Sequence, residues 1–207
     1  MEIEYKGANC VVIKDHDAVI VVDPTSNVSV KEANNPDAVI LSTQAQFTQG
    51  EREAKNFVID MPGEYEHKDI SVRGLPVHVH TDKDGTSGTM YRLETKDAHV
   101  AIIGHTDAPL SDDDLETLGL IDILIIPIGG GGYTLDARDA ATIVRQISPK
   151  IVIPTHFADS AIKYPVPQDS VDEFVKQIGG AYDKKNILKL KGSLPNAMTV
   201  VELSRTA

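Results

Sequence analysis

The stretch that decides the fold is Val39-Ile40-Leu41-Ser42-Thr43-Gln44-Ala45-Gln46-Phe47-Thr48-Gln49-Gly50. It opens with an apolar run and ends in polar residues and a glycine. That order is typical of a buried strand that delivers side chains into a loop. The loop carries Gln44, Gln46 and Gln49, with Thr48 between the last two. The sequence therefore predicts a polar site at the end of a strand.

The spacing of these four residues resembles a motif of the metallo-β-lactamase superfamily. In that family an apolar strand is followed by His-x-His-x-Asp-His. Here the two leading histidines are Gln44 and Gln46, the aspartate is Thr48, and the last histidine is Gln49. Imidazole and carboxylate groups bind zinc well, whereas a neutral amide or a hydroxyl is a poor ligand. The resemblance implies the family's fold together with a metal motif whose ligands are replaced.

Composition and charge limit the class of protein. The 207 residues fit one domain, 1–207, and 41% apolar residues are enough for a core. The net charge of −11 argues against nucleic acid or an anionic membrane as partner, because phosphate binding needs a basic face. Cys10 is the only cysteine, the residues after Met1 lack the basic-then-apolar pattern of a signal segment, and no apolar run reaches roughly 18 residues. We expect a cytoplasmic protein.

The order of the elements predicts two sheets packed face to face, with helices outside. Strands dominate the first half, and strands alternate with helices in the second. The expected strands are 10–13, 18–22, 38–42, 57–60, 70–75, 89–93, 98–103, 121–127, 151–154, 186–191 and 198–203. Helices are expected after Ser111, over 135–147 and over 171–178, and a turn is expected over 61–66. The resemblance implies the same architecture, the α/β metallo-β-lactamase-like αββα sandwich of two mixed β-sheets.

The family resemblance extends to three further ligand positions. Gly104-His105-Thr106 stands where the relatives have Gly-Asp-Thr, whose aspartate bridges two metals. The segment 151–157 matches a strand that ends in Ile-Val-Ile-Pro-x-His-Tyr, so His156 stands at a ligand position. His80 is the nearest match to another histidine ligand, offset by about one position. The resemblance also covers Asp23, which either orients the next loop through hydrogen bonds or simply forms a turn before Pro24.

Two functions remain open at this point. The favoured one is a degenerate, non-catalytic homologue with a binding, regulatory or assembly role and no cofactor. Neutral polar replacements suit a site without metal, because a carboxylate cluster without a cation would repel itself. The alternative is a zinc-dependent hydrolase of a lactone, ester or phosphoester, with His80, His105 and His156 as ligands and Asp107 as an outer partner that orients one of them.

The glycine run 129–132 also has two interpretations. Glycine amides can bind a phosphate, but the run lacks the Lys-Ser/Thr of a P-loop. We favour a loop that passes close over the site. The sequence does not identify a small-molecule or protein partner, and it is compatible with a homo-oligomer.

Overall fold

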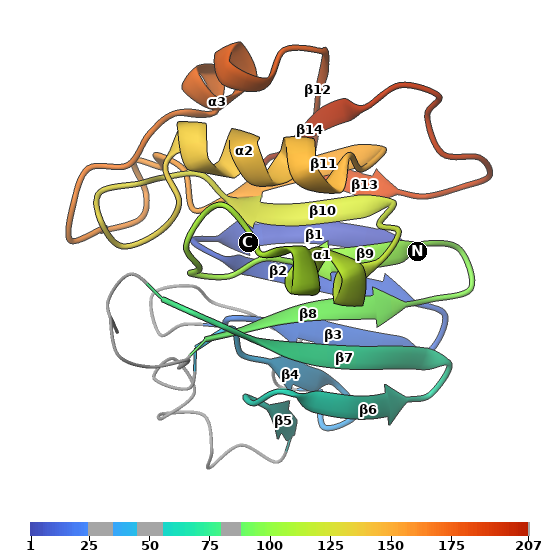
Figure 1. Ribbon diagram of the computed structural model, residues 1–207. Coiled ribbons are helices and arrows are strands. Elements are labelled where there is room, and N and C mark those ends of the chain that lie inside the picture. The colour runs from blue at the N-terminus through green and yellow to red at the C-terminus, as the bar shows by residue number, and fades with distance from the viewer. Residues whose placement is uncertain (25–34, 45–55, 80–87, 207) are drawn as a thin grey trace.

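The computed structural model describes residues 1–24, 35–44, 56–79 and 88–206. Within these residues the chain forms two mixed β-sheets (Figure 1). The six-stranded sheet has the spatial order β13 (Ile187–Lys189), β1 (Glu2–Gly7), β2 (Cys10–Asp15), β3 (Ala18–Val22), β4 (Val39–Leu41) and β5 (Phe57–Ile59). The strands from β13 to β3 are antiparallel, and β3, β4 and β5 are parallel.

The second sheet has eight strands in the described part of the chain. Their spatial order is β12 (Ala181–Lys185), β14 (Thr199–Leu203), β11 (Ile151–Thr155), β10 (Ile123–Pro127), β9 (His99–Ile102), β8 (Gly88–Glu94), β7 (Ile70–Val77) and β6 (Gly63–His67). The half from β12 to β9 is parallel, and the half from β9 to β6 is antiparallel. The carboxyl ends of the parallel strands β9, β10 and β11 therefore meet at one edge, where loops collect functional side chains.

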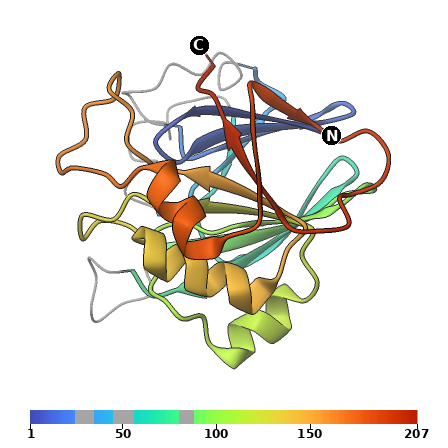
Figure 2. The same cartoon turned by 90° about the horizontal axis from the view of Figure 1, so that it is seen from above.

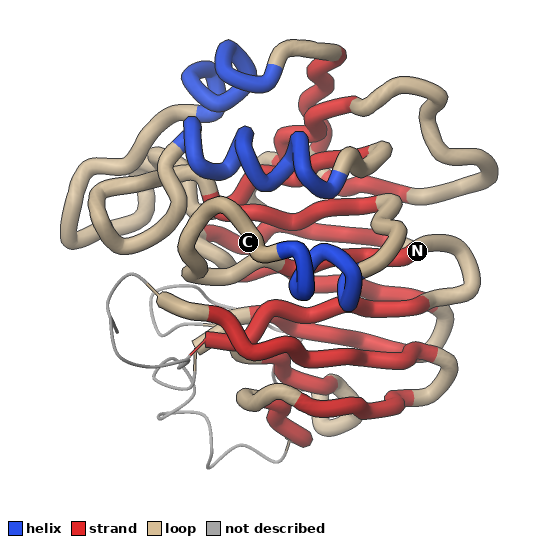
Figure 3. Tube along the Cα trace, viewed as in Figure 1, coloured by secondary structure: helices blue, strands red, loops and turns tan. Residues whose placement is uncertain are grey.

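Among the described residues, three helices lie on the outer side of the eight-stranded sheet: α1 (Asp112–Leu118), α2 (Ala137–Ile147) and α3 (Val171–Ile178) (Figures 2 and 3). Ser111 and Asp114 form a reciprocal capping box at α1, and Ser170 caps α3. The side chain of Asp136 caps α2 by accepting from two backbone N–H groups. No helix in the described ranges is long and apolar enough to cross a membrane.

The core between the sheets is largely aliphatic. Val11 and Ile13 point into it, while the alternate residues Cys10 and Val12 belong to a separate buried cluster on the other face of β2. The Tyr91 hydroxyl of β8 lies 2.7 Å from the Ser42 carbonyl oxygen and 2.9 Å from the Ile59 carbonyl oxygen. This hydroxyl fastens the eight-stranded sheet to the strand ends of the six-stranded one.

The predicted αββα class is confirmed, and most predicted elements are present with shifted ends. The turn expected over 61–66 is wrong in part, because Gly63–His67 is strand β6. Pairing with β7, including Glu64 opposite Arg73, extends the chain beyond the Pro62-Gly63 turn signal. Strand β12 was not predicted, since its residues are exposed and lack apolar alternation. It forms only because β14 offers a parallel edge.

Candidate functional site

Strand ends from both sheets meet at one place. Thr43, just after β4, packs against Gly104, just after β9, so tightly that a Cβ atom on residue 104 would lie 2.3 Å from the Thr43 Cβ. The Thr89 backbone N–H also donates to the Thr43 carbonyl oxygen at 2.8 Å. Glycine at 104 is therefore required for the two loops to approach each other.

Asp23 fastens the loop that begins with Thr43. Its carboxylate accepts from the Thr43 backbone N–H at 2.7 Å and from the Thr43 hydroxyl at 2.5 Å. Gln44 follows as a buried residue, and its carbonyl oxygen accepts from the Ser42 hydroxyl at 2.6 Å. The first position of the expected motif is thus placed at the strand end. The other three positions, Gln46, Thr48 and Gln49, lie outside the described residues.

His105 is buried beside a polar pair from two other strands. The side-chain amide nitrogen of Asn9 lies 3.2 Å from His105 Nδ1. The Thr155 hydroxyl in turn donates to Asn9 Oδ1 at 3.1 Å. These three side chains come from the β1–β2 turn, the end of β9 and the end of β11, so the hydrogen bonds cross between the two sheets.

His156 projects from a strained backbone at the end of β11. Its φ of 52° lies in the left-handed region, and its N–H donates to the Ala8 carbonyl oxygen at 2.7 Å. Its Nδ1 lies 2.8 Å from Gln168 Oε1, and its ring centroid is 5.0 Å from that of Tyr164. Burial lowers the pKa of His156 below its usual 6.5, although the Gln168 hydrogen bond acts in the opposite direction.

The structure brings two of the three candidate histidines together. The ring centroids of His105 and His156 are 5.5 Å apart, and the rings meet edge to face at 86°. His80 lies outside the described residues. Asp107 is exposed, and its backbone N–H donates to the His78 carbonyl oxygen at 3.2 Å. The described part of the chain contains no group of three histidine, cysteine or acidic side chains placed to hold a metal ion.

The donor set at this site is a poor match to zinc. A catalytic zinc centre normally takes three protein ligands among imidazole, thiolate and carboxylate. The motif positions carry three amides and one hydroxyl. His105 stands where the family resemblance implies a bridging carboxylate, and its Nδ1 already faces the Asn9 amide nitrogen. Among the described residues, the side chains at this site do not fit the dinuclear centre that the fold family implies.

Sequence reasoning missed Asn9 and Gln168, the two amides that contact the histidines. Asn9 sits in a two-residue turn, and Gln168 lies in an irregular segment without periodicity, so neither belongs to a motif.

The glycine run 129–132 was the sequence signal that pointed to this part of the site. A Cβ atom on residue 129 would lie 1.9 Å from the His156 carbonyl oxygen and 2.1 Å from Gln168 Oε1. The prediction that this loop passes close over the site is confirmed at Gly129.

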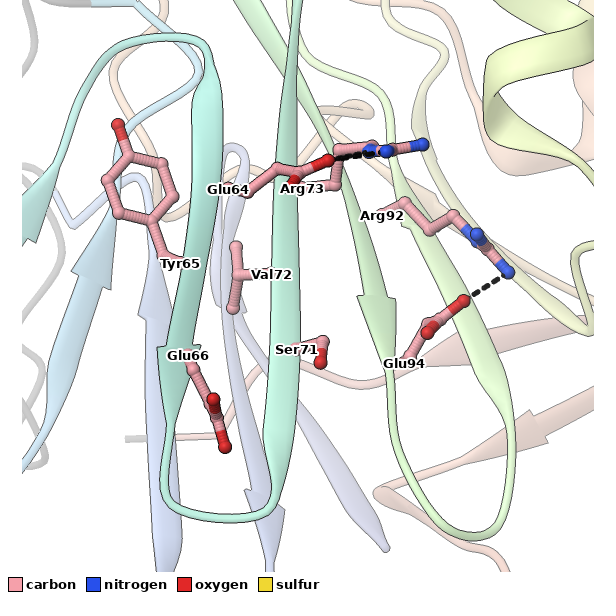
Figure 4. Close-up of a pocket in the computed structure, with 8 residues that line it drawn as sticks. All are labelled: Glu64, Tyr65, Glu66, Ser71, Val72, Arg73, Arg92 and Glu94. Carbon is pink, nitrogen blue, oxygen red and sulfur yellow. Dashed lines mark hydrogen bonds and ion pairs between the residues drawn. The ribbon is translucent and has the colours of Figure 1, made fainter.

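A separate concavity of about 460 Å³ lies on the strands β6, β7 and β8 (Figure 4). Its charges largely neutralise one another, since Arg73 pairs with Glu64 at 2.5 Å and Arg92 with Glu94 at 2.6 Å. Its lining residues include none of the histidine-site residues. The paired charges and the shallow setting give this surface no evident chemistry, so the histidine site is the functional candidate.

The two-sheet fold is that of the β-lactamase superfamily, and the comparison with protein families shows the same membership. The model of the β-lactamase superfamily domain matches residues 2–156, more than half of the chain. The chain belongs to this family.

Particular relatives refine the comparison. A UPF0173 protein of Pyrococcus furiosus is 25% identical over 182 residues, which cover 76% of this chain and 83% of the relative. A UPF0173 metal-dependent hydrolase of Thermodesulfovibrio yellowstonii is 34% identical over 82 residues, 38% of this chain and only 29% of that protein. A solved structure from Thermotoga maritima, named as a candidate Zn-dependent hydrolase of the metallo-β-lactamase superfamily, has a TM-score of 0.75 at 22% identity and covers 98% of both chains. The structural likeness establishes the fold alone.

Proposed function

We propose that this protein is a degenerate member of the superfamily that binds a ligand or partner without metal-dependent catalysis. The observation that carries the proposal is the environment of His105. In place of a bridging carboxylate the chain has an imidazole whose Nδ1 lies 3.2 Å from an amide nitrogen of Asn9. An amide nitrogen can only donate, so it uses the lone pair that a metal would need at this atom.

The residues of the motif support the same conclusion. Gln44, Gln46, Thr48 and Gln49 keep polarity and hydrogen-bonding capacity but leave no imidazole or carboxylate at the four motif positions. Such side chains stay neutral, so no cation is needed to hold them together. The loop is suited to hydrogen bonding a small organic molecule or a protein segment. The net charge of −11 favours a neutral or cationic partner over an anionic one.

Metal content tests the proposal. Protein purified after growth with added zinc and manganese should hold well under one metal ion per chain by elemental analysis. A strong chelator should leave its melting temperature unchanged, since no metal-binding energy supports the fold. The proposal fails if metal is stoichiometric and is lost in His156→Ala but kept in His16→Ala, which alters an exposed histidine of the β2–β3 turn.

Restoring the family's ligands tests whether the loop has kept its geometry. We expect that Gln44→His, Gln46→His, Thr48→Asp and Gln49→His, combined with His105→Asp, recover zinc binding. A bridging carboxylate is needed because it reduces the repulsion between two dications, which a neutral imidazole does not. Isothermal titration of the folded variant with zinc measures the result. Absence of binding at micromolar zinc would mean that these positions do not converge.

A zinc-dependent hydrolase is the second candidate. Two observations favour it: the names of the relatives, and the 5.5 Å separation of the His105 and His156 rings. With His80 as third ligand, such a site would activate a water molecule for attack on an ester, lactone or phosphoester. Stoichiometric zinc together with hydrolysis that a chelator abolishes would favour this candidate over the binding protein.

A further inference from the structure

The hydrogen bonds around His105 fix where its proton sits. The Asn9 amide nitrogen faces His105 Nδ1 at 3.2 Å, while Asn9 Oδ1 accepts from the Thr155 hydroxyl at 3.1 Å. An amide nitrogen has hydrogens and no acceptor lone pair. Nδ1 of His105 must therefore accept, and the neutral ring carries its proton on Nε2.

The hydrogen bonds around His156 fix the opposite arrangement. The amide nitrogen of Gln168 donates to the carbonyl oxygens of Val166 at 3.0 Å and Pro167 at 3.3 Å. These oxygens can only accept, so they orient the amide with Oε1 toward His156 Nδ1 at 2.8 Å. Nδ1 of His156 must donate, and the lone pair of the neutral ring is on Nε2.

The backbone around Gln168 holds this arrangement rigidly. The Asp169 N–H donates to the Gly129 carbonyl oxygen at 2.7 Å, and the Ala158 N–H donates to the Asp169 carbonyl oxygen at 3.0 Å. A side chain at 129 would overlap both Gln168 Oε1 and the His156 carbonyl oxygen. The glycine thus allows the Gln168 segment to close on the histidine, and side-chain rearrangement there is restricted.

We propose that Asn9 and Gln168 are positioning residues that hold His105 and His156 in opposite tautomers. His156 offers an acceptor at Nε2, whereas His105 carries a proton at Nε2. A metal shared by both Nε2 atoms would need a lone pair from each ring. His105 would then carry its proton on Nδ1, against the amide hydrogens of Asn9. The pair instead suits a small organic ligand whose hydroxyl or N–H group donates to Nε2 of His156.

Nuclear magnetic resonance reads the tautomers directly in the full chain. Long-range ¹H–¹⁵N correlation of the seven histidines, at a pH where the rings are neutral, separates protonated from unprotonated ring nitrogens. His105→Gln and His156→Gln assign the two rings. We expect protonated Nδ1 in His156 and protonated Nε2 in His105. The same tautomer in both rings would overturn the proposal.

Substitution of Gln168 tests the cause. Gln168→Met removes the acceptor, and the protonated fraction of His156 Nδ1 should fall at least twofold. Gln168→Glu keeps an oxygen acceptor for His156 Nδ1, so that nitrogen should stay protonated, although the second carboxylate oxygen then faces the Val166 and Pro167 carbonyl oxygens and destabilises the segment. The matched control is Gln146→Met, because Gln146 holds the Leu110 backbone from α2 through both atoms of its amide. If Gln168→Met and Gln146→Met both leave His156 unchanged, Gln168 does not position it.

This inference deepens the proposed function but can fail separately from it. Addition of zinc alone to the labelled protein provides the distinction. Opposite tautomers with no zinc-induced change support both proposals. Opposite tautomers in the chelated protein, followed by loss of the His156 Nε2 signal on equimolar zinc, would sustain the positioning roles and overturn the metal-free function.

Discussion

The ring centroids of His105 and His156 lie 5.5 Å apart at neighbouring strand ends, yet the surroundings of the two side chains differ. His105 is buried at 6% exposure, and its Nδ1 faces a donor, Asn9. His156 is only partly buried, sits at φ 52°, and its Nδ1 faces an acceptor, Gln168. One residue is integrated into the hydrogen bonds between the sheets. His156 has a strained backbone and is held by Gln168, which is the arrangement expected of a side chain that contacts a ligand.

The supports of the two histidines also differ in kind. Asn9 and Thr155 belong to regular elements or their tight turns, so the core itself fixes them. Gln168 belongs to an irregular segment whose position depends on contact with Gly129. Disturbing His105 should therefore affect the fold locally, whereas disturbing the support of His156 should release a whole segment.

The largest expected effect on the unfolding free energy comes from disturbing the contact between Gly129 and the Gln168 segment. Gly129→Ala places a methyl group against backbone and side-chain oxygens, and overpacking of this kind costs about 3 kcal/mol of unfolding free energy. Chemical denaturation measures it. Gly132→Ala is the control, since no atom lies within 4 Å of its Cβ position and only its φ of 77° opposes alanine, at about 1 kcal/mol. Equal losses would mean that the Gly129 contact does not hold the segment.

Asn9→Ala should have an intermediate effect. It leaves His105 Nδ1 and the Thr155 hydroxyl without their buried partner, which costs about 2 kcal/mol. Asn56→Ala is a matched change, because the Asn56 amide also makes two hydrogen bonds, here to the backbone oxygens of Asn35 and Ala38, but at a partly solvated position. Denaturation curves should place its loss nearer 1 kcal/mol. A larger loss for Asn56 would contradict the importance assigned to the His105 environment.

The smallest effect is on pH dependence. Burial lowers the folded pKa of His156 below 6.5, so the unfolded chain binds more protons between the folded pKa and 6.5. His156 therefore makes the unfolding free energy rise with pH through that window and level off above it. In His156→Gln, the contribution of His156 to the slope of unfolding free energy against pH should disappear. Above pH 7 the curves of the wild type and the variant should run parallel. An unchanged slope in denaturation curves measured across this window would show that His156 is not held neutral by burial.

The sequence by itself determined the architecture of the two sheets and the positions of the main helices. Apolar runs such as Val39–Leu41 and Ile123–Pro127 gave the buried strands, and Ser111 and Ser170 marked two helix starts. These signals are local, because strand burial and helix capping depend on residues a few positions apart. The order of the elements then restricted how two sheets could pack.

Only the tertiary structure decided which side chains face the histidines. Asn9 and Thr155 are 146 positions apart, and Gln168 reaches His156 from a segment with no periodicity. Strand β12, likewise, exists because β14 offers an edge to an otherwise exposed segment. Hydrogen bonds of this kind depend on where the sheets bring distant residues together, and amide side chains occur too widely for their type alone to indicate a role. Local patterns specify helices and strands because the residues involved are close in the sequence. The hydrogen-bond partners of the histidines are distant in the sequence, so only the packing of the two sheets specifies them.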